Sequence, residues 1–282
     1  MLFEVASSEI PLLIFTVLVP MGVTSMGLFG IAHASLGMSE EDSKKANKML
    51  SISAIVTIVG LIASFAHLGS PTHVFGMASG IGASPLSNEI VVAGIAILVA
   101  VVYWIFALAK NPAENVHKIF GVVLIILGLV CALFTGLAYM MSTIATWNSP
   151  VGAISQIFAA IFGGACLAAL VLALAGQKVE KPICMCALIG AVGVAVMVLV
   201  QGASVAGVIN SAGMTLNSVM TQYWVVAVIA IVLAAIAGVL TFKCAGKEMP
   251  VGTAVIVAVL AIAALVLVRI CFYGIFLSVG LF

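Results

Sequence analysis

The sequence predicts an all-α integral membrane protein in which residues 1–282 form a single domain, a bundle of eight transmembrane helices. Hydrophobic residues make up 65% of the chain and charged residues 7%, whereas soluble domains carry about 25% charged residues. The apolar runs continue unbroken for about 20 residues, as spanning helices need, and do not alternate as in a membrane β-barrel. No polar stretch is long enough to form a soluble domain, and the net charge of +1 does not indicate a nucleic-acid partner.

Eight apolar segments are long enough to cross a bilayer. We predict spans at Pro11–Ala34, Met49–His67, Glu89–Ala109, Ile119–Met141, Val151–Ala175, Ile183–Ala203, Tyr223–Phe242 and Val251–Leu277. No lysine or arginine precedes the first span, as the start of a signal peptide requires, so we expect this segment to stay as a helix. The residues expected in aromatic belts are Tyr139, Trp147, Tyr223 and Trp224 at the outer membrane surface, and Tyr103 and Trp104 at the inner one.

The lysines predict the orientation of the bundle. All of them fall in alternate connections between the predicted spans, at residues 35–48, 110–118, 176–182 and 243–250. The other connections and both termini hold none. Because positive charge stays on the cytoplasmic side, the sequence predicts cytoplasmic lysine connections and both termini on the outer, periplasmic side. The predicted location is the bacterial cytoplasmic (inner) membrane, crossed several times.

Strongly polar residues on five spans fall at one depth. They are Glu9, His67, Glu89, Gln201, Arg269 and Tyr273. At about 1.5 Å per residue, those within the spans stand roughly 30 Å from the lysine connections, near the outer surface. Charged groups inside a membrane are costly and therefore indicate function. The pattern predicts one polar site that is close to the outer surface and open sideways to lipid.

Most of these residues also have a structural interpretation. Glu9 and Glu89 could simply be stabilised by a helix dipole in the first turn of a helix, and His67 could end its helix. Arg269 could extend its charge to the outer surface, and Gln201 could bond a neighbouring helix.

The connection at residues 68–88 is the strongest site candidate among the loops. Gly and Pro residues within it cannot continue a regular helix, and irregular backbone near a membrane survives at an interface or a lined cavity. The histidines, in contrast, do not predict a haem. His33 and His67 belong to opposite ends of the bundle, and His73 and His117 are expected in loops. We predict no haem and no bound metal in this chain.

The residues around this connection resemble the membrane-anchor subunit of bacterial dimethyl sulfoxide reductases. The resemblance runs through Ala63–Pro71 (ASFAHLGSP) and Gly82–Ile90 (GASPLSNEI). Shorter matches follow at residues 11–17, at 201–203, and from Arg269 to Gly280. The family implies an eight-helix anchor without haem. It oxidises menaquinol and passes the electrons to a four-cluster iron–sulfur subunit, which feeds a molybdenum bis-pterin catalytic subunit in anaerobic respiration.

The resemblance implies specific roles for the polar residues. His67 corresponds to the family's quinol-site histidine, and we predict that His67 and Glu89 are catalytic: His67 accepts a hydrogen bond and a proton from the quinol, and Glu89 relays protons outward. The remaining predicted quinol-binding residues are Gly69, Ser70, Glu9, Gln201, Arg269 and Tyr273. Arg269 would keep the carboxylates ionised or stabilise the developing quinone oxygen. The iron–sulfur subunit is expected to dock on the outer face, over residues 68–88. The terminal acceptor would be reduced by the catalytic subunit and not by this chain.

Two other functions fit parts of the pattern. A small secondary transporter could use the outer polar residues as its substrate site, although transporter sites usually lie at the midplane between repeated halves. A purely structural anchor would leave the quinol chemistry to another subunit.

Overall fold

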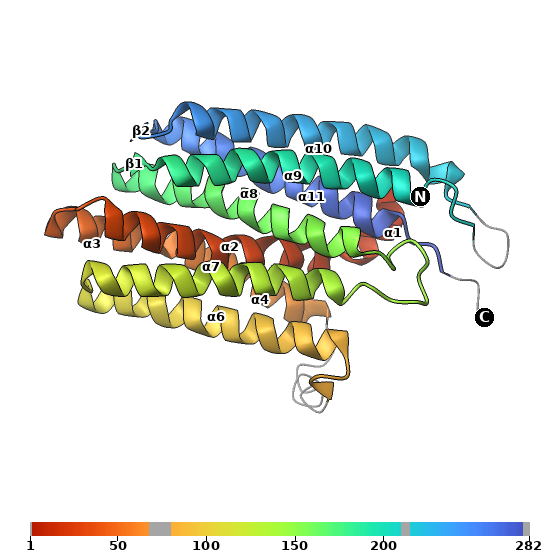
Figure 1. Cartoon of the computed structure of the whole chain (residues 1–282), viewed down its shortest axis with the longest axis horizontal. Helices are drawn as coiled ribbons and strands as arrows, with labels where there is room; N and C mark the ends of the chain where they lie inside the picture. The colour runs from red at the N-terminus through yellow and green to blue at the C-terminus, as the bar shows by residue number, and fades with distance from the viewer. Residues whose placement is uncertain (1, 68–79, 210–214, 279–282) are drawn as a thin grey trace.

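The computed structural model describes residues 2–67, 80–209 and 215–278, and it is a bundle of long helices lying side by side (Figure 1). The helices are α1 (Leu2–Ser8), α2 (Ile10–Ser35), α3 (Glu40–Met49), α4 (Ser51–His67), α6 (Pro85–Lys110), α7 (Glu114–Leu137), α8 (Pro150–Ala175), α9 (Lys181–Val205), α10 (Asn217–Lys243) and α11 (Val251–Gly274). Within these residues, eight helical segments are long and apolar enough to cross a membrane, which confirms the predicted number of spans.

The central helices are α2 and α8, whose spans are the most buried. Helices α4, α6 and α7 lie on one side of them, and α9, α10 and α11 on the other (Figure 1). Small residues bring α2 and α7 together: a Cβ atom added to Gly30 would lie 2.9 Å from the Cα of Gly121. Because lipid tails are as apolar as the helices, such close van der Waals packing is what holds spans together.

Several helix ends differ from the prediction. Helix α6 begins at Pro85, four residues before the predicted start, because Pro85 suits the first helical turn and the Ser84 side chain accepts a hydrogen bond from the Ser87 amide. Glu89 therefore lies a full turn inside the helix. Helix α7 ends at Leu137, four residues earlier than predicted, and α11 ends at Gly274, three residues earlier. The described residues just beyond these two ends are joined by hydrogen bonds, from the Ala145 amide to the Leu277 carbonyl and from the Thr146 hydroxyl to the Ile275 carbonyl.

Three predicted connections contain regular structure. Residues 40–49 form α3, and Ser39 caps its start, because the Ser39 side chain accepts a hydrogen bond from the Asp42 amide. Strands β1 (Lys178–Val179) and β2 (Lys247–Glu248) pair in antiparallel register and join the connections before α9 and α11.

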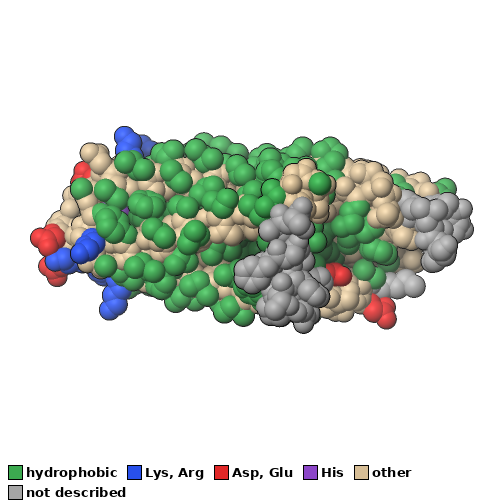
Figure 2. Space-filling view, turned by 90° about the horizontal axis from the view of Figure 1, so that it is seen from below, with side chains coloured by type: hydrophobic (Ala, Val, Ile, Leu, Met, Phe, Trp, Pro, Cys, Tyr) green, Lys and Arg blue, Asp and Glu red, His purple; other side chains and the backbone are tan. Residues whose placement is uncertain are grey.

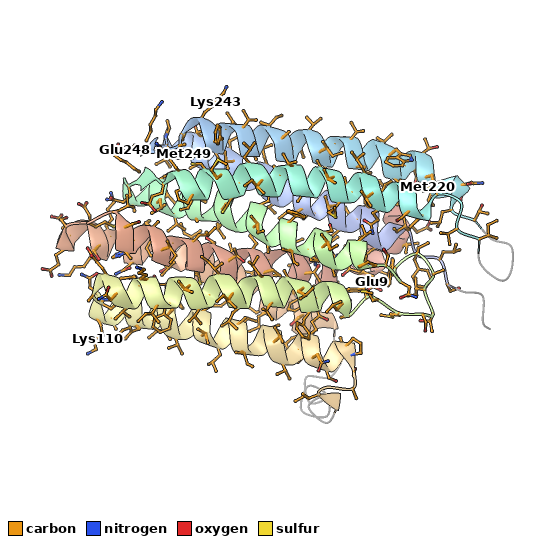
Figure 3. All side chains as sticks on the ribbon, in the orientation of Figure 1. Glu9, Lys110, Met220, Lys243, Glu248 and Met249 are labelled. Atoms are coloured by element: carbon orange, nitrogen blue, oxygen red, sulfur yellow. The ribbon has the colours of Figure 1, made fainter. Side chains whose placement is uncertain are left out.

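All the lysines lie at one end of the bundle (Figure 2). Figure 3 shows Lys110, Lys243 and Glu248 at this end and Glu9 at the other. Helix α1 and the end of α11 also lie at the end opposite the lysines (Figure 1). The apolar surface between the two ends matches a bilayer-spanning region. The structure thus separates the two sets of connections as the lysine pattern predicts, and which end faces the cytoplasm stays a prediction.

Candidate functional site

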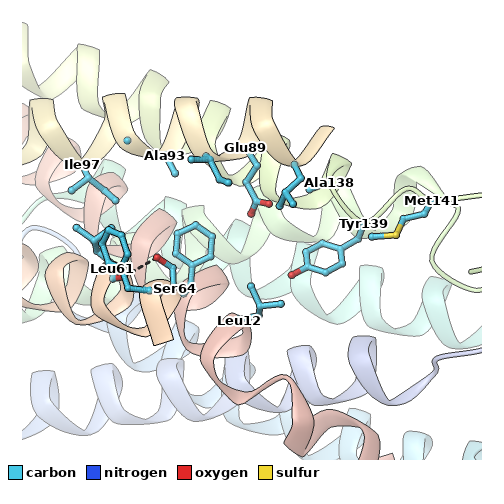
Figure 4. A pocket seen from close by; sticks show the side chains of 14 residues that line it. Leu12, Leu61, Ser64, Glu89, Ala93, Ile97, Ala138, Tyr139 and Met141 are labelled. Carbon is cyan, nitrogen blue, oxygen red and sulfur yellow. Dashed lines mark hydrogen bonds between the residues drawn. The ribbon is translucent and has the colours of Figure 1, made fainter. Parts of the chain in front are cut away.

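A cavity of about 410 Å³ lies between α2, α4, α6 and the turn after α7, near the end opposite the lysines (Figure 4). Its lining is formed by Leu12, Phe15, Leu61, Ser64, Phe65, Leu86, Glu89, Ile90, Ala93, Gly94, Ile97, Ala138, Tyr139 and Met141. Most of these side chains are apolar. Ser64 donates its hydroxyl proton to the carbonyl of Leu61 on its own helix, at 2.7 Å. Among the lining residues that the structure describes, the polar groups left to face a ligand are those of Glu89 and Tyr139.

Glu89 brings a buried carboxylate to the cavity. Its position in the second turn of α6 directs it inward, and only 5% of the residue is exposed. Its Oε1 atom has no hydrogen-bond partner among the residues that the structure describes. Thr135 lies beside the carboxylate. A buried carboxylate is costly unless it is paired, so a ligand that donates a hydrogen bond to Glu89 would lower this cost.

Arg269 and two tyrosines form a second polar feature behind the cavity. The Arg269 guanidinium donates a hydrogen bond to the Tyr273 hydroxyl at 2.8 Å. The Tyr273 hydroxyl lies 2.7 Å from that of Tyr139, which lines the cavity. Arg269 is only 4% exposed. Among the described residues, no carboxylate lies within 4.0 Å of its guanidinium. The structure thus brings Glu89 and the Arg269–Tyr273 pair to one site.

The other predicted site residues are placed differently. Helix α4 ends at His67, but the His67 side chain, Gly69 and Ser70 lie outside the described residues, as does most of the 68–88 connection. Glu9 is half-buried at the start of α2 and makes no capping hydrogen bond with its side chain. Gln201 is buried on α9, which packs against α8, α10 and α11, and it does not line the cavity.

Tyr139 was not identified as a site residue from the sequence. Tyr139, Trp147 and Tyr223 were predicted to belong to an outer aromatic belt, but each is at most 7% exposed and packs inside the bundle. Trp147 stacks on Phe272, with ring centroids 5.3 Å apart, and its indole nitrogen donates to the Phe272 carbonyl. Tyr139 points inward because α7 ends at Leu137, four residues before the predicted end, and the chain then turns back into the bundle. The apolar run through Met141 gave no sign of this turn.

The histidines at the lysine end also differ from the prediction. His117 lies on α7 and not in a loop, and its ring stacks on that of His33 with centroids 3.6 Å apart. Each ring also takes part in a buried hydrogen bond of 2.8 Å, between His33 and Ser43 and between His117 and Tyr103. The inner-belt prediction for Tyr103 is therefore wrong, because this residue is fully buried. Stacked rings present their faces to each other, unlike two axial haem ligands, whose nitrogens point at one another.

Comparisons with known proteins cover nearly the whole length of this protein. A family model described as DMSO reductase anchor subunit (DmsC) matches residues 4–275. The C subunit of the anaerobic dimethyl sulfoxide reductase of Escherichia coli (strain K12) is 29% identical over 287 residues, covering 97% of this sequence and 96% of that protein. The anaerobic dimethyl sulfoxide reductase subunit YnfH of the same organism is 26% identical over 277 residues, with the same coverage. The C subunit from Haemophilus influenzae is 25% identical over 279 residues, again with 97% and 96% covered. No solved structure matches significantly.

Proposed function

This chain belongs to the DMSO reductase anchor subunit family, and we propose that the cavity beside Glu89 is where it oxidises menaquinol. Family membership confirms the resemblance found in the sequence and makes the chain the transmembrane anchor of a reductase complex, not a secondary transporter. The finer steps of quinol oxidation are inferred from the site.

The observation that carries the proposal is an apolar cavity with one buried carboxylate, Glu89, whose Oε1 atom has no hydrogen-bond partner among the described residues. Its volume of about 410 Å³ falls within the range of small-molecule sites, about 300–1,000 Å³. The lining follows α6 from Glu89 to Ile97, which corresponds to about 12 Å of helix. The polar end suits a ring hydroxyl, and the apolar length suits the ring and the first part of an isoprenoid tail.

The proposed reaction uses residues at the polar end. A quinol that becomes a quinone loses two electrons and two protons. The Glu89 carboxylate accepts a hydrogen bond and one proton from a ring hydroxyl, and His67, by its resemblance to the family, is expected to accept the other. The electrons pass to a partner iron–sulfur subunit and on to a molybdenum bis-pterin catalytic subunit. Partner docking over residues 68–88 would keep the quinol close to the nearest cluster.

The proposed orientation follows from the lysines. With the lysine end in the cytoplasm of a bacterial inner membrane, the cavity opens near the periplasmic surface. Protons from the quinol would then leave on the same side as the partner subunits, and quinol oxidation would not separate charge across the membrane.

A leucine at Gly94 tests the cavity. Gly94 lines it on α6, and a Cβ atom added there meets nothing within 4 Å, so the backbone has room for a side chain that occupies part of the cavity. The matched control is Gly252→Leu, at a helical glycine on α11 whose added Cβ is equally free. The assembled complex would be purified in mild detergent and checked for iron, acid-labile sulfide and molybdenum.

We expect Gly94→Leu to lower oxidation of a menaquinol analogue at least tenfold, with metal content unchanged and the control active. Normal oxidation in an assembled Gly94→Leu complex would contradict the proposal. A chain that purifies alone and without metal in several detergents would contradict the anchoring of a molybdenum reductase.

A further inference from the structure

We propose that Tyr139 donates a hydrogen bond to a ring oxygen of the bound quinol or quinone, and that Arg269 acts on this oxygen through Tyr273 and not by contact. The inference rests on the proposed quinol site and adds a second polar group to it. Tyr139 would be a ligand-contacting residue, while Tyr273 and Arg269 would be positioning residues.

Tyr139 is held rigidly at the wall of the cavity. Its ring meets those of Trp147, Phe272 and Tyr273 edge to face, with centroids 5.4–5.6 Å apart. Only 7% of the residue is exposed. Figure 4 shows its ring and the Glu89 carboxylate pointing into the same space. A fixed hydroxyl loses little conformational entropy when it binds a ligand, so this geometry suits recognition.

The hydrogen-bond chain sets the direction of the Tyr139 hydroxyl. Arginine has donors only, so Arg269 donates to the Tyr273 oxygen. Tyr273 is fully buried, and its own proton needs an acceptor. Within the described part of the chain, the Tyr139 oxygen at 2.7 Å is the acceptor available to it. With Tyr273 donating to Tyr139, the Tyr139 proton is left to point at a ligand oxygen.

The Arg269 charge reaches the cavity through this chain of hydrogen bonds. The guanidinium carbon lies 4.4 Å from the Phe272 ring centroid, 4.6 Å from that of Tyr273 and 5.3 Å from that of Tyr139. These aromatic faces stabilise the cation, but they do not neutralise it as a carboxylate would. A buried cation strengthens a connected chain of hydrogen bonds and favours negative charge nearby. The favoured charges are the Glu89 carboxylate and a ring oxygen that has lost its proton.

The two polar groups therefore have complementary roles. Glu89 accepts a hydrogen bond, and Tyr139 donates one. A flat apolar ring that carries one hydroxyl donor and one oxygen acceptor satisfies both groups, as a quinol does, whereas a quinone offers acceptors alone and can bond only the Tyr139 hydroxyl. Tyr139 keeps its proton throughout: both electrons go to the iron–sulfur partner, and the two quinol protons go to the acceptors already proposed.

The test is saturation binding of two tail-free ligands to the purified, assembled complex. The ligands are menadione, which is neutral, and a hydroxynaphthoquinone that is anionic at neutral pH. The variants are Tyr139→Phe and Tyr273→Phe, which keep the rings and remove one hydroxyl each. The matched control is Tyr223→Phe, because Tyr223 is equally buried but donates its hydroxyl to the Val198 carbonyl on α9, away from the cavity.

We expect Tyr139→Phe to weaken binding of both ligands about three- to tenfold, the usual effect of one lost hydrogen bond. Tyr273→Phe should weaken binding about two- to threefold, and more for the anion, although Tyr273 does not line the cavity. The Tyr223→Phe control should bind as the unmodified protein does. A KM that rises while kcat stays nearly constant in Tyr139→Phe would support ligand contact.

The possible failures can be told apart. Unchanged affinity in Tyr139→Phe, with binding still abolished by Gly94→Leu, would overturn this inference and leave the quinol site standing. Weaker binding in Tyr139→Phe alone would overturn the part played by Arg269 and Tyr273. No saturable binding to the unmodified complex would overturn the proposed function itself.

Discussion

Tyr139 and Tyr273 are separated by 134 positions in the chain, yet their hydroxyl oxygens lie 2.7 Å apart. The contact joins the turn after α7 to the last turn of α11. Tyr273 therefore stands between the Arg269 guanidinium and Tyr139 in the wall of the cavity. From sequence, Arg269 was expected to keep the carboxylates ionised or to stabilise the developing quinone oxygen. In the structure its guanidinium donates to Tyr273, and the relayed effect on a ligand oxygen proposed above rests on this contact.

Replacement of Glu89 by glutamine removes the proposed proton acceptor and keeps the shape of the side chain. We expect quinol oxidation to fall about 100-fold, the lower end of what a general base contributes. The measurement is steady-state oxidation of a menaquinol analogue by the assembled complex. Glu114→Gln is the control, because Glu114 is exposed at the start of α7 at the lysine end. Equal activity in the two variants would remove Glu89 from the reaction.

The stacked histidines at the lysine end are expected to contribute to stability and not to quinol binding. Tyr103→Phe leaves the His117 Nδ1 atom buried without its 2.8 Å partner, at a cost of about 1–3 kcal/mol. Thermal unfolding in detergent should show a lower Tm, while menadione affinity stays unchanged. Lys118→Gln, at an exposed site on the same end of α7, should unfold like the unmodified protein. A loss of menadione affinity in Tyr103→Phe would contradict this separation of roles.

Because α2 and α7 pack closely, we expect a single methyl group added between them to lower the stability of the bundle. A Cβ atom at Gly121 would lie 2.7 Å from the backbone nitrogen of Ile31, so Gly121→Ala must push the two helices apart. Overpacking of this kind costs about 1–3 kcal/mol. The measurement is thermal unfolding, with Gly252→Ala as the control at a site of open space. Equal Tm values for the two variants would show that the bundle absorbs the extra volume freely.

The orientation can be measured with single cysteines at the two ends of the bundle. Ser8→Cys lies exposed on α1, and Lys110→Cys lies exposed at the end of α6. In intact spheroplasts, a membrane-impermeant maleimide should label Ser8→Cys at once and Lys110→Cys only after permeabilisation. The unmodified protein gives the background from its native cysteines. The reverse pattern of labelling would place the lysine end outside and overturn the proposed sidedness.

Hydropathy and charge were enough to predict the membrane class, the number of spans and the gathering of lysines at one end, and local motifs were enough to predict the family. Each spanning segment must be apolar on its own account, and a polar residue within a span is costly whichever helices pack beside it. Glu89 could be identified for the same reason.

Which polar residues share a site depended on the packing of the helices. Gln201 has the same predicted depth as Glu89 but lies on α9, away from the cavity. Tyr139 looks in sequence like an interfacial aromatic residue but turns inward, because α7 ends at Leu137 and the following turn packs on α11. His33 and His117 meet because glycines let α2 and α7 approach closely. Depth is a property of one helix, whereas contact depends on which faces of several helices pack together, and hydropathy does not specify that packing.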